Sequence, residues 1–163
     1  MRQTSFAEMH CSLARSLEVV GDWWTPLILR DVYLGIDRFA DLAEDLGISR
    51  NLLTERLNGL VDDGVLRRER YRQRPPRDRY VLTESGRQLI PILVALTAWG
   101  DRWQPPDGGP PIRFEHRDHD AVPVVACGAC GAAIVADELT ARPGPGGRAA
   151  PGTMVLARRL ATP

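Results

Sequence analysis

Apolar residues recur at helical spacing in the first third of the chain and predict two helices there. The first is expected over Ser12–Val20, where the apolar positions share one face, and Gly21 ends it. The second is expected over Trp24–Leu34. This helix tolerates Pro26 in its first turn and ends before Gly35.

Two further helices are expected directly after these, separated by a short turn. Phe39–Leu46 carries its apolar residues on one face, which predicts a short third helix. Gly47 and Ile48 make the turn, and Ser49 is a suitable N-cap. The fourth helix is then expected over Arg50–Asp62, with a buried leucine-rich face.

The period of the pattern changes after Gly64. Residues 65–72 and 77–82 are expected to form two strands, and the two prolines between them indicate an open loop rather than a tight turn. Thr83 is expected to cap a last helix that runs to Trp103. We therefore predict a mainly α (α+β) fold. The last helix has a wide apolar stripe, made of Leu89, Ile92, Leu93, Leu96, Trp99, Gly100 and Trp103.

Composition divides the chain near residue 104. Residues 1–103 form the predicted domain, and residues 104–111 form a Pro/Gly linker, since prolines there exclude regular structure. Residues 112–141 form a small appendage that contains cysteine and histidine. Residues 142–163 begin with a second Pro/Gly stretch, so we expect a flexible tail.

The third and fourth helices have the order of a helix-turn-helix. One helix fits end-first into the major groove of B-DNA, and arginine, asparagine and hydroxyl side chains suit guanine, adenine and phosphate. Any two-helix hairpin shares this outline, so the residue types matter. The candidate DNA contacts on the fourth helix are Ser49, Arg50, Asn51, Thr54 and Arg56.

The predicted hairpin strengthens the case for DNA. Residues 67–79 hold seven arginines against Glu69 and Asp78, a local charge of +5. A basic hairpin directly after a recognition helix is typical of a wing, whose cations lie along phosphates or the minor groove. A mixed-sign run would more often be a solvated face. The candidate wing contacts are Arg72, Arg74, Arg77 and Arg79.

The overall charge is zero, with 21 basic and 21 acidic residues, and by itself this argues against a nucleic-acid binder. The zero is a cancellation, because residues 1–49 carry a net −4 and residues 67–79 a net +5. Binding depends on the local field rather than the sum. No apolar run approaches the length of a membrane span, and the N-terminal residues lack the apolar stretch expected of a signal peptide. We therefore expect a cytoplasmic, nucleoid-associated protein.

The wide stripe of the last helix predicts self-association. A domain of this size cannot cover the stripe alone, so pairing with a symmetry mate, together with the first helix, would bury it. An alternative is that Trp99 and Trp103 pack under the C-terminal appendage.

Motifs in order across residues 11–103 resemble the HxlR family, small bacterial winged-helix transcriptional regulators related in fold to the MarR group. The resemblance implies a homodimer joined through its terminal helices, with two recognition helices on a pseudo-palindromic double-stranded DNA operator. It leaves repression or activation open, and we expect repression. The matching segments are residues 11–24, Ile28-Leu29, Gly35, 38–42, 47–49, 53–57, Asp63-Gly64, Pro75-Pro76, 80–86 and Trp99-Gly100.

The resemblance also suggests an effector-sensing site. Cys11 matches the N-terminal cysteine that senses oxidants in some family members, and Arg15 lies one turn away to supply positive charge. A buried or helix-capping thiol is an equally good interpretation. A small-molecule effector, if one exists, would lie between the dimer helices and the DNA-binding lobe, with Trp23, Trp24 and Trp99 as apolar walls.

Cysteine and histidine residues in the appendage suggest a metal. Cys127 and Cys130 form a CxxC knuckle, and His116 and His119 precede it, so four ligands are available for one structural zinc ion. The spacing between the two pairs is short for a zinc ribbon, so descent from a ribbon that lost ligands is an alternative. No cofactor is otherwise required.

No catalytic pattern accompanies these residues. The sequence lacks a nucleophile motif, a phosphate-binding glycine loop and a metalloprotease helix, so we do not expect an enzyme. The alternatives to a sequence-specific regulator are a winged-helix redox or ligand sensor, or a protein-interaction adaptor, without specific DNA binding.

Overall fold

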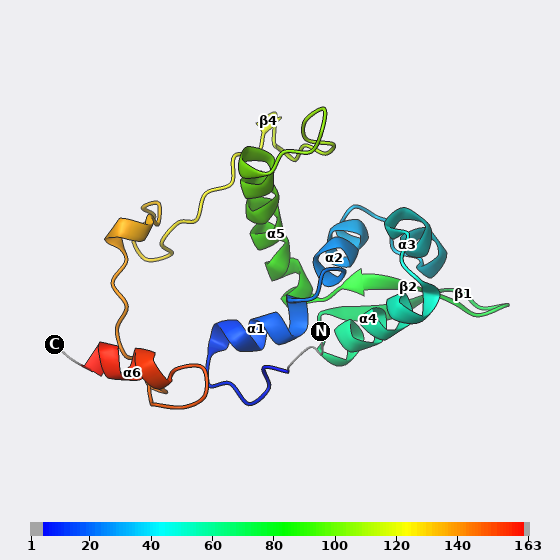
Figure 1. Cartoon of the computed structure of the whole chain (residues 1–163). Helices are drawn as coiled ribbons and strands as arrows, with labels where there is room; N and C mark the ends of the chain where they lie inside the picture. Colours follow the sequence, from blue (N-terminus) through cyan, green and yellow to red (C-terminus); the bar gives the residue numbers. More distant parts are fainter. Residues whose placement is uncertain (1–4, 162–163) are drawn as a thin grey trace.

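The computed structural model describes residues 5–161, and the predicted helices and hairpin lie in its first hundred residues (Figure 1). No helix in this range is long and apolar enough to cross a membrane. The elements are α1 (Ser12–Val20), α2 (Thr25–Tyr33), α3 (Phe39–Leu46), α4 (Arg50–Asp62), β1 (Leu66–Arg72), β2 (Arg77–Leu82), α5 (Glu84–Trp103), β3 (Glu115–His116), β4 (His119–Asp120), the 3-10 helix η1 (Ala136–Glu138) and α6 (Met154–Ala161).

The predicted elements form with nearly the predicted bounds because local signals fix their ends. Pro26 lies in the first turn of α2, and Gly47 ends α3 with a φ of 61°, a left-handed conformation that glycine adopts without steric cost. Ser49 Oγ accepts a hydrogen bond from the N–H of Leu52 and caps α4. Two helices thus meet at a short turn, which confirms the helix-turn-helix.

The antiparallel strands β1 and β2 form the wing. Leu66 pairs with Leu82, and an irregularity between Arg70 and Arg72 precedes the tip. The base of the wing is held by the α2–α3 connection, because the N–H of Tyr80 donates to the carbonyl of Asp37 at 2.8 Å. The mainly α winged-helix prediction is confirmed.

One apolar core joins α2, α3, α4, the wing and the first half of α5. Burying these side chains supplies the main driving force for the fold. In α4 the buried face is separated by helical spacing from an exposed polar face. The fully buried members are Ile28, Leu29, Leu42, Leu53, Leu57, Leu60 and Leu66.

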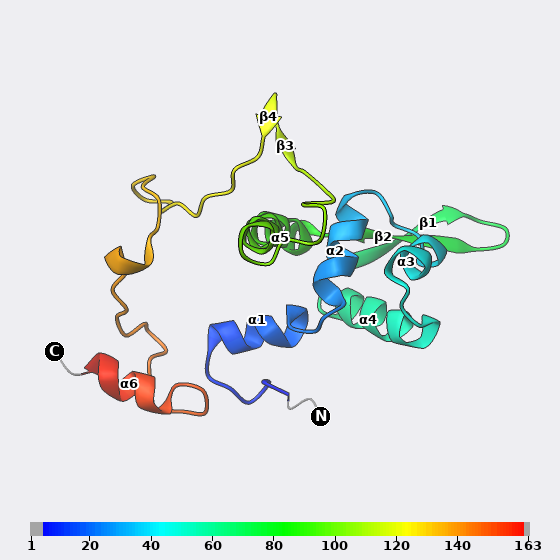
Figure 2. The ribbon, with the colours of Figure 1, turned by 45° about the horizontal axis from the view of Figure 1, so that its top comes forward.

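Beyond the linker the chain runs away from this core. The strands β3 and β4, each two residues long, pair as a small hairpin, and an extended segment follows (Figure 2). No residue from 104 to 161 is buried in the monomer. Residues 154–161, expected to be part of a loose tail, form α6 instead. Apolar residues at Met154, Leu156 and Leu160, with no proline or glycine among them, favour this helix.

Candidate DNA-binding interface

The N-terminal turns of α4 present the predicted base-reading side chains. Leu53 and Leu57 are buried against the core, and Arg50, Asn51 and Thr54 are exposed on the opposite face. The helix N-terminus also carries unpaired backbone N–H groups and a partial positive charge, which favour phosphate. The arrangement suits insertion of this end into a groove.

The neighbours of Arg50 restrict its position. Its guanidinium lies over the ring of Phe39, with the central carbon 5.1 Å from the ring centroid. The Thr54 hydroxyl donates to the backbone carbonyl of Arg50 at 2.8 Å. The hydroxyl retains its lone pairs as acceptors, whereas the Asn51 amide is exposed with both donor and acceptor available.

Arg56, the fifth predicted contact of this helix, is engaged by an acid of the domain itself, and its role as a DNA contact stays a prediction. Its side chain is only 26% exposed, and Nε lies 3.4 Å from Oδ1 of Asp22. Asp22 in turn accepts hydrogen bonds from the backbone N–H groups of Trp24 and Thr25 at the start of α2. Arg56 therefore ties α4 to the α1–α2 turn, a long-range contact that helical spacing cannot reveal.

Arg67, Arg70 and Arg79 along the sides of the wing pair with acids. Arg70 pairs with Asp78 across the hairpin, and Arg79 Nη2 lies 3.0 Å from Glu69. Arg79 also lies 3.8 Å from Asp37. The hydrogen bond from Arg79 holds the pKa of Glu69 below its ordinary value, and the hydrogen bond from Arg70 does the same for Asp78. Arg79 therefore takes part in ion pairs at the base of the wing, and its predicted contact with DNA stays a prediction.

The tip of the wing is different. Arg72, Arg74 and Arg77 are exposed, and none has a carboxylate partner within the described residues. Arg72 Nε donates to the backbone carbonyl of Arg74 at 3.0 Å, which draws the loop together. The three predicted tip residues therefore form one cationic cluster.

Two arginines outside the predicted set join this surface. Arg38, just before α3, lies over the ring of Tyr71 in β1, 4.8 Å from its centroid. Arg68 donates to the side chain of Asn58 near the end of α4. Sequence reasoning missed Arg38 because its place beside the wing comes from a bridge to Arg79, which is far away in the sequence.

The start of α4 and the tip of the wing extend from the same side of the domain. Both views show them away from α1, α5 and α6 (Figures 1 and 2). This places the arginine, asparagine and hydroxyl groups of α4 next to a cluster of unneutralised guanidinium groups. The arrangement can place one helix in a groove while the wing tip follows the phosphates beside it.

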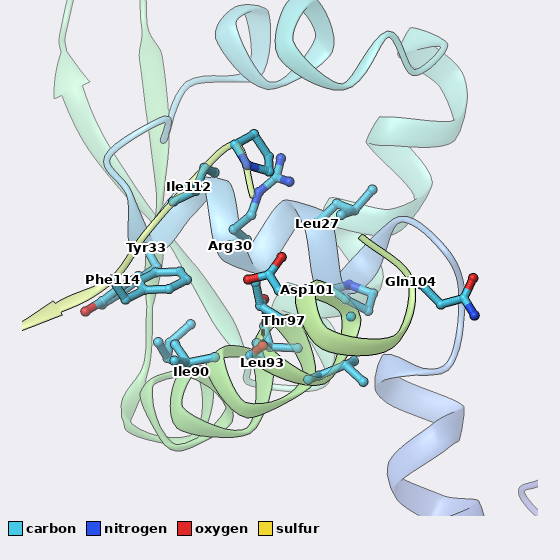
Figure 3. A pocket seen from close by; sticks show the side chains of 15 residues that line it. Leu27, Arg30, Tyr33, Ile90, Leu93, Thr97, Asp101, Gln104, Ile112 and Phe114 are labelled. Atoms are coloured by element: carbon cyan, nitrogen blue, oxygen red, sulfur yellow. Dashed lines mark hydrogen bonds between the residues drawn. The ribbon is translucent and has the colours of Figure 1, made fainter. Parts of the chain in front are cut away.

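The three tryptophans expected to wall a ligand pocket are not brought together. Trp23 is 90% exposed, Trp24 packs at the edge of the core, and Trp99 is exposed on α5. A cavity of about 290 Å³ lies instead between α2, α5 and the linker end (Figure 3). Its walls include Leu27, Arg30, Tyr33, Ile90, Leu93, Thr97, Asp101, Ile112 and Phe114.

Cys11 lies half-buried at the N-cap of α1 with a free thiol. The chain returns to it from the far end, because the N–H of His10 donates to the carbonyl of Pro151 at 2.8 Å. A Cβ added at Gly152 would lie 3.5 Å from that of Cys11.

The four candidate zinc ligands remain two separate pairs. The rings of His116 and His119 lie 5.7 Å apart in the β3–β4 hairpin. Cys127 and Cys130 share a tight turn, where hydrogen bonds from the backbone of Ala129 and of Cys130 lower the pKa of Cys127. Within residues 5–161 no group of three or more His, Cys, Asp or Glu could hold a metal ion. One chain thus does not assemble the predicted site.

Comparison with known proteins agrees with this geometry. An uncharacterized HTH-type transcriptional regulator of Mycobacterium tuberculosis, Rv3095, is 44% identical over 140 residues, covering 85% of this chain and 89% of the relative. YdeP of Bacillus subtilis, another uncharacterized HTH-type transcriptional regulator, is 34% identical over 58% of this chain and 74% of its own.

Solved structures match as well. PA1607, described as a candidate transcription factor, has a TM-score of 0.74 and 33% identity over 85% of this chain and 98% of its own. The redox regulator HypR in its reduced form has a TM-score of 0.53 and 33% identity, over 56% of this chain and 92% of its own. The model of the HxlR-like helix-turn-helix matches residues 19–108. The chain therefore belongs to the HxlR-like helix-turn-helix family, and it is a transcriptional regulator rather than an enzyme.

Proposed function

We propose that this protein is a homodimeric repressor that binds one pseudo-palindromic operator sequence-specifically. The observation that carries the proposal is the unneutralised cluster of Arg72, Arg74 and Arg77 beside the exposed start of α4. The acids that neutralise the sides of the wing leave this tip free. The tip would supply affinity through phosphates, and α4 would supply base recognition.

Base recognition is assigned to the first turn of α4. Asn51 can make a paired donor and acceptor contact with adenine, and Arg50 can do so with guanine. Ser49 and Thr54 lie beside them and suit phosphate contacts. A repressor acts by occupying an operator that overlaps a promoter, so tight site-specific binding is sufficient for this role.

Dimerisation is assigned to α1 and α5. Leu13 and Leu17 are exposed on α1, and Leu96, Trp99 and Trp103 are exposed on α5. Such a run of large apolar side chains favours burial against another surface. A two-fold arrangement would place two copies of α4 on successive major grooves, about 34 Å apart.

The test is a binding titration on DNA of the promoter next to the protein's own gene. We expect one inverted repeat to bind tightly and with strong salt dependence, and Asn51→Ala to weaken that binding by about 1–3 kcal/mol per half-site while relaxing base preference at one position. Gly59→Ala, also on α4 but farther from its start and with nothing within 4 Å of an added Cβ, is the control. Uniformly weak binding to all sequences would favour an interaction adaptor instead.

An effector has one structural argument in its favour. The cavity of Figure 3 joins α2, which supports α3 and α4, to α5, the proposed dimer helix. Most of its walls are apolar, and Arg30 and Asp101 also line it, so it suits a small, largely apolar molecule with a polar end. A molecule bound there would change operator affinity, and Leu93→Trp, which fills the cavity, would abolish that response.

A further inference from the structure

The segment that follows the β3–β4 hairpin has almost nothing to pack on in one chain. We call residues 121–153 the arm. Its large apolar side chains are exposed, and Val122 and Val124 are 81% and 73% accessible. Ordering so many residues costs conformational entropy that only burial can offset. The other exposed apolar residues of the arm are Val125, Ile134, Val135 and Leu139.

The arm is nevertheless fixed at both of its ends. It leaves the end of α5 through the linker and hairpin, and it returns to the start of α1. There Pro151 accepts the hydrogen bond from His10, and His10 Nε2 lies 2.6 Å from the carbonyl of Gly146. Both views show the arm running apart from α5 and α1 between these points (Figures 1 and 2). A free tail would not close back on the same chain.

A groove lies between the first part of the arm and the outer face of α5. It measures about 770 Å³, and its walls include Ile92 and Ala95 from α5 and Val122, Val124 and Val125 from the arm. Glu115, His116 and His119 of the hairpin and Tyr33 of α2 are the charged or titratable residues that line it. An apolar groove of this size accepts large apolar side chains, not a nucleic acid or a charged peptide.

We propose that this groove holds the terminal helices of a second copy of the chain, so that each arm clasps its partner. The proposal rests on the homodimer proposed above and specifies what the arm does in it. Trp99 and Trp103 are exposed on α5, and Leu13 is exposed on α1, so the same chain carries suitable occupants. A two-fold axis that seats the partner's helices in this groove also seats this chain's helices in the partner's groove. Both unpartnered surfaces are then buried at once.

The clasp makes the two chains interlocked rather than merely adjacent. An arm anchored at both ends cannot release the partner without losing the contacts of His10 or bending at the linker. Dissociation of the dimer is therefore expected to be slow compared with a dimer held by flat helix faces, because most affinity differences appear in the dissociation rate.

The test uses a photo-reactive benzoylphenylalanine at position 124 of the full-length protein, with position 34 as the control. Leu34 is exposed at the end of α2 and lines no part of the groove. Mixed isotope-labelled and unlabelled chains distinguish links between chains from links within one. We expect position 124 to give covalent dimers joined to α5 or α1 of the other chain, and position 34 to give none.

A second variant measures the energetic role of the groove. Val122→Asp with Val124→Asp should weaken dimerisation at least about 100-fold, because four apolar side chains per dimer lose their burial, whereas Leu34→Asp should leave it unchanged. A stable wild-type dimer whose position-124 links fall only within one chain would overturn the clasp and leave the homodimer intact. A wild-type monomer at micromolar concentration would remove both.

Discussion

The wing provides a quantitative contrast between two arginines on one hairpin. Arg74 at the tip has no carboxylate partner within the described residues, whereas Arg79 at the base lies 3.0 Å from Glu69 and 3.8 Å from Asp37. An arginine already neutralised by two acids releases few counterions from DNA. Arg74→Ala should therefore reduce the salt dependence of operator binding, and Arg79→Ala should reduce it far less.

The size of the effect follows from counterion release. The logarithm of the binding constant falls by about 0.9 per phosphate contact for each unit in the logarithm of salt concentration. A dimer has two wings, so Arg74→Ala should lower the slope by about 1.8. When the salt concentration is raised from about 50 to about 200 mM, the binding constant of the wild type should therefore fall by a factor about 12 times larger than that of the variant.

The assay is fluorescence anisotropy with a labelled operator duplex at several salt concentrations. A scrambled duplex shows whether the loss is independent of sequence, as expected for a phosphate contact. The reasoning is wrong if Arg74→Ala leaves the slope unchanged, or if Arg79→Ala lowers it equally. A change confined to base preference would mean that the tip reads bases.

Two predictions concern the fold. Burial raises the pKa of Asp31, against the opposing ion pair with Arg30, so folding binds a proton more readily and this contribution to stability is lost as pH rises above about 4. In urea unfolding, the free energy of unfolding of Asp31→Asn should increase relative to that of the wild type as the pH is raised from about 3.5 to 7. A difference between the two proteins that does not change with pH would refute this. Gly86→Ala should cost about 1–3 kcal/mol, because its Cβ would lie 2.4 Å from the Val65 carbonyl oxygen. Gly59→Ala, which meets nothing within 4 Å, should not destabilise, and equal losses at both positions would contradict the steric argument.

The winged-helix domain could be predicted from sequence because its signals are local. Glycine turns, the Ser49 cap and helical spacing fix where α3 and α4 begin and end. The run of arginines likewise identifies the wing. These features depend on residues a few positions apart, so they can be found without the tertiary structure.

What the sequence did not reveal depends on distant contacts. The helical position of Arg56 suggests DNA, but Asp22 turns it toward the α1–α2 turn. Residue type alone groups Trp23 and Trp99 as walls of a pocket, but both side chains are exposed in the fold. The path of the arm depends on His10, more than 130 residues from Gly146.

The first turn of α5 is joined to the end of the recognition unit. The Thr83 hydroxyl donates to the carbonyls of Gly64 and Val65 at 2.6 and 3.0 Å, and Gly86 allows α5 to lie directly against Val65. A 20-residue helix is about 30 Å long, so α5 extends about 30 Å from the wing, where it begins, to its far end. A tilt of about 10° at that end moves the other by about 5 Å. The angle at which two copies of α5 cross would therefore set the spacing of the recognition helices, so a change far from the DNA could alter the fit to an operator.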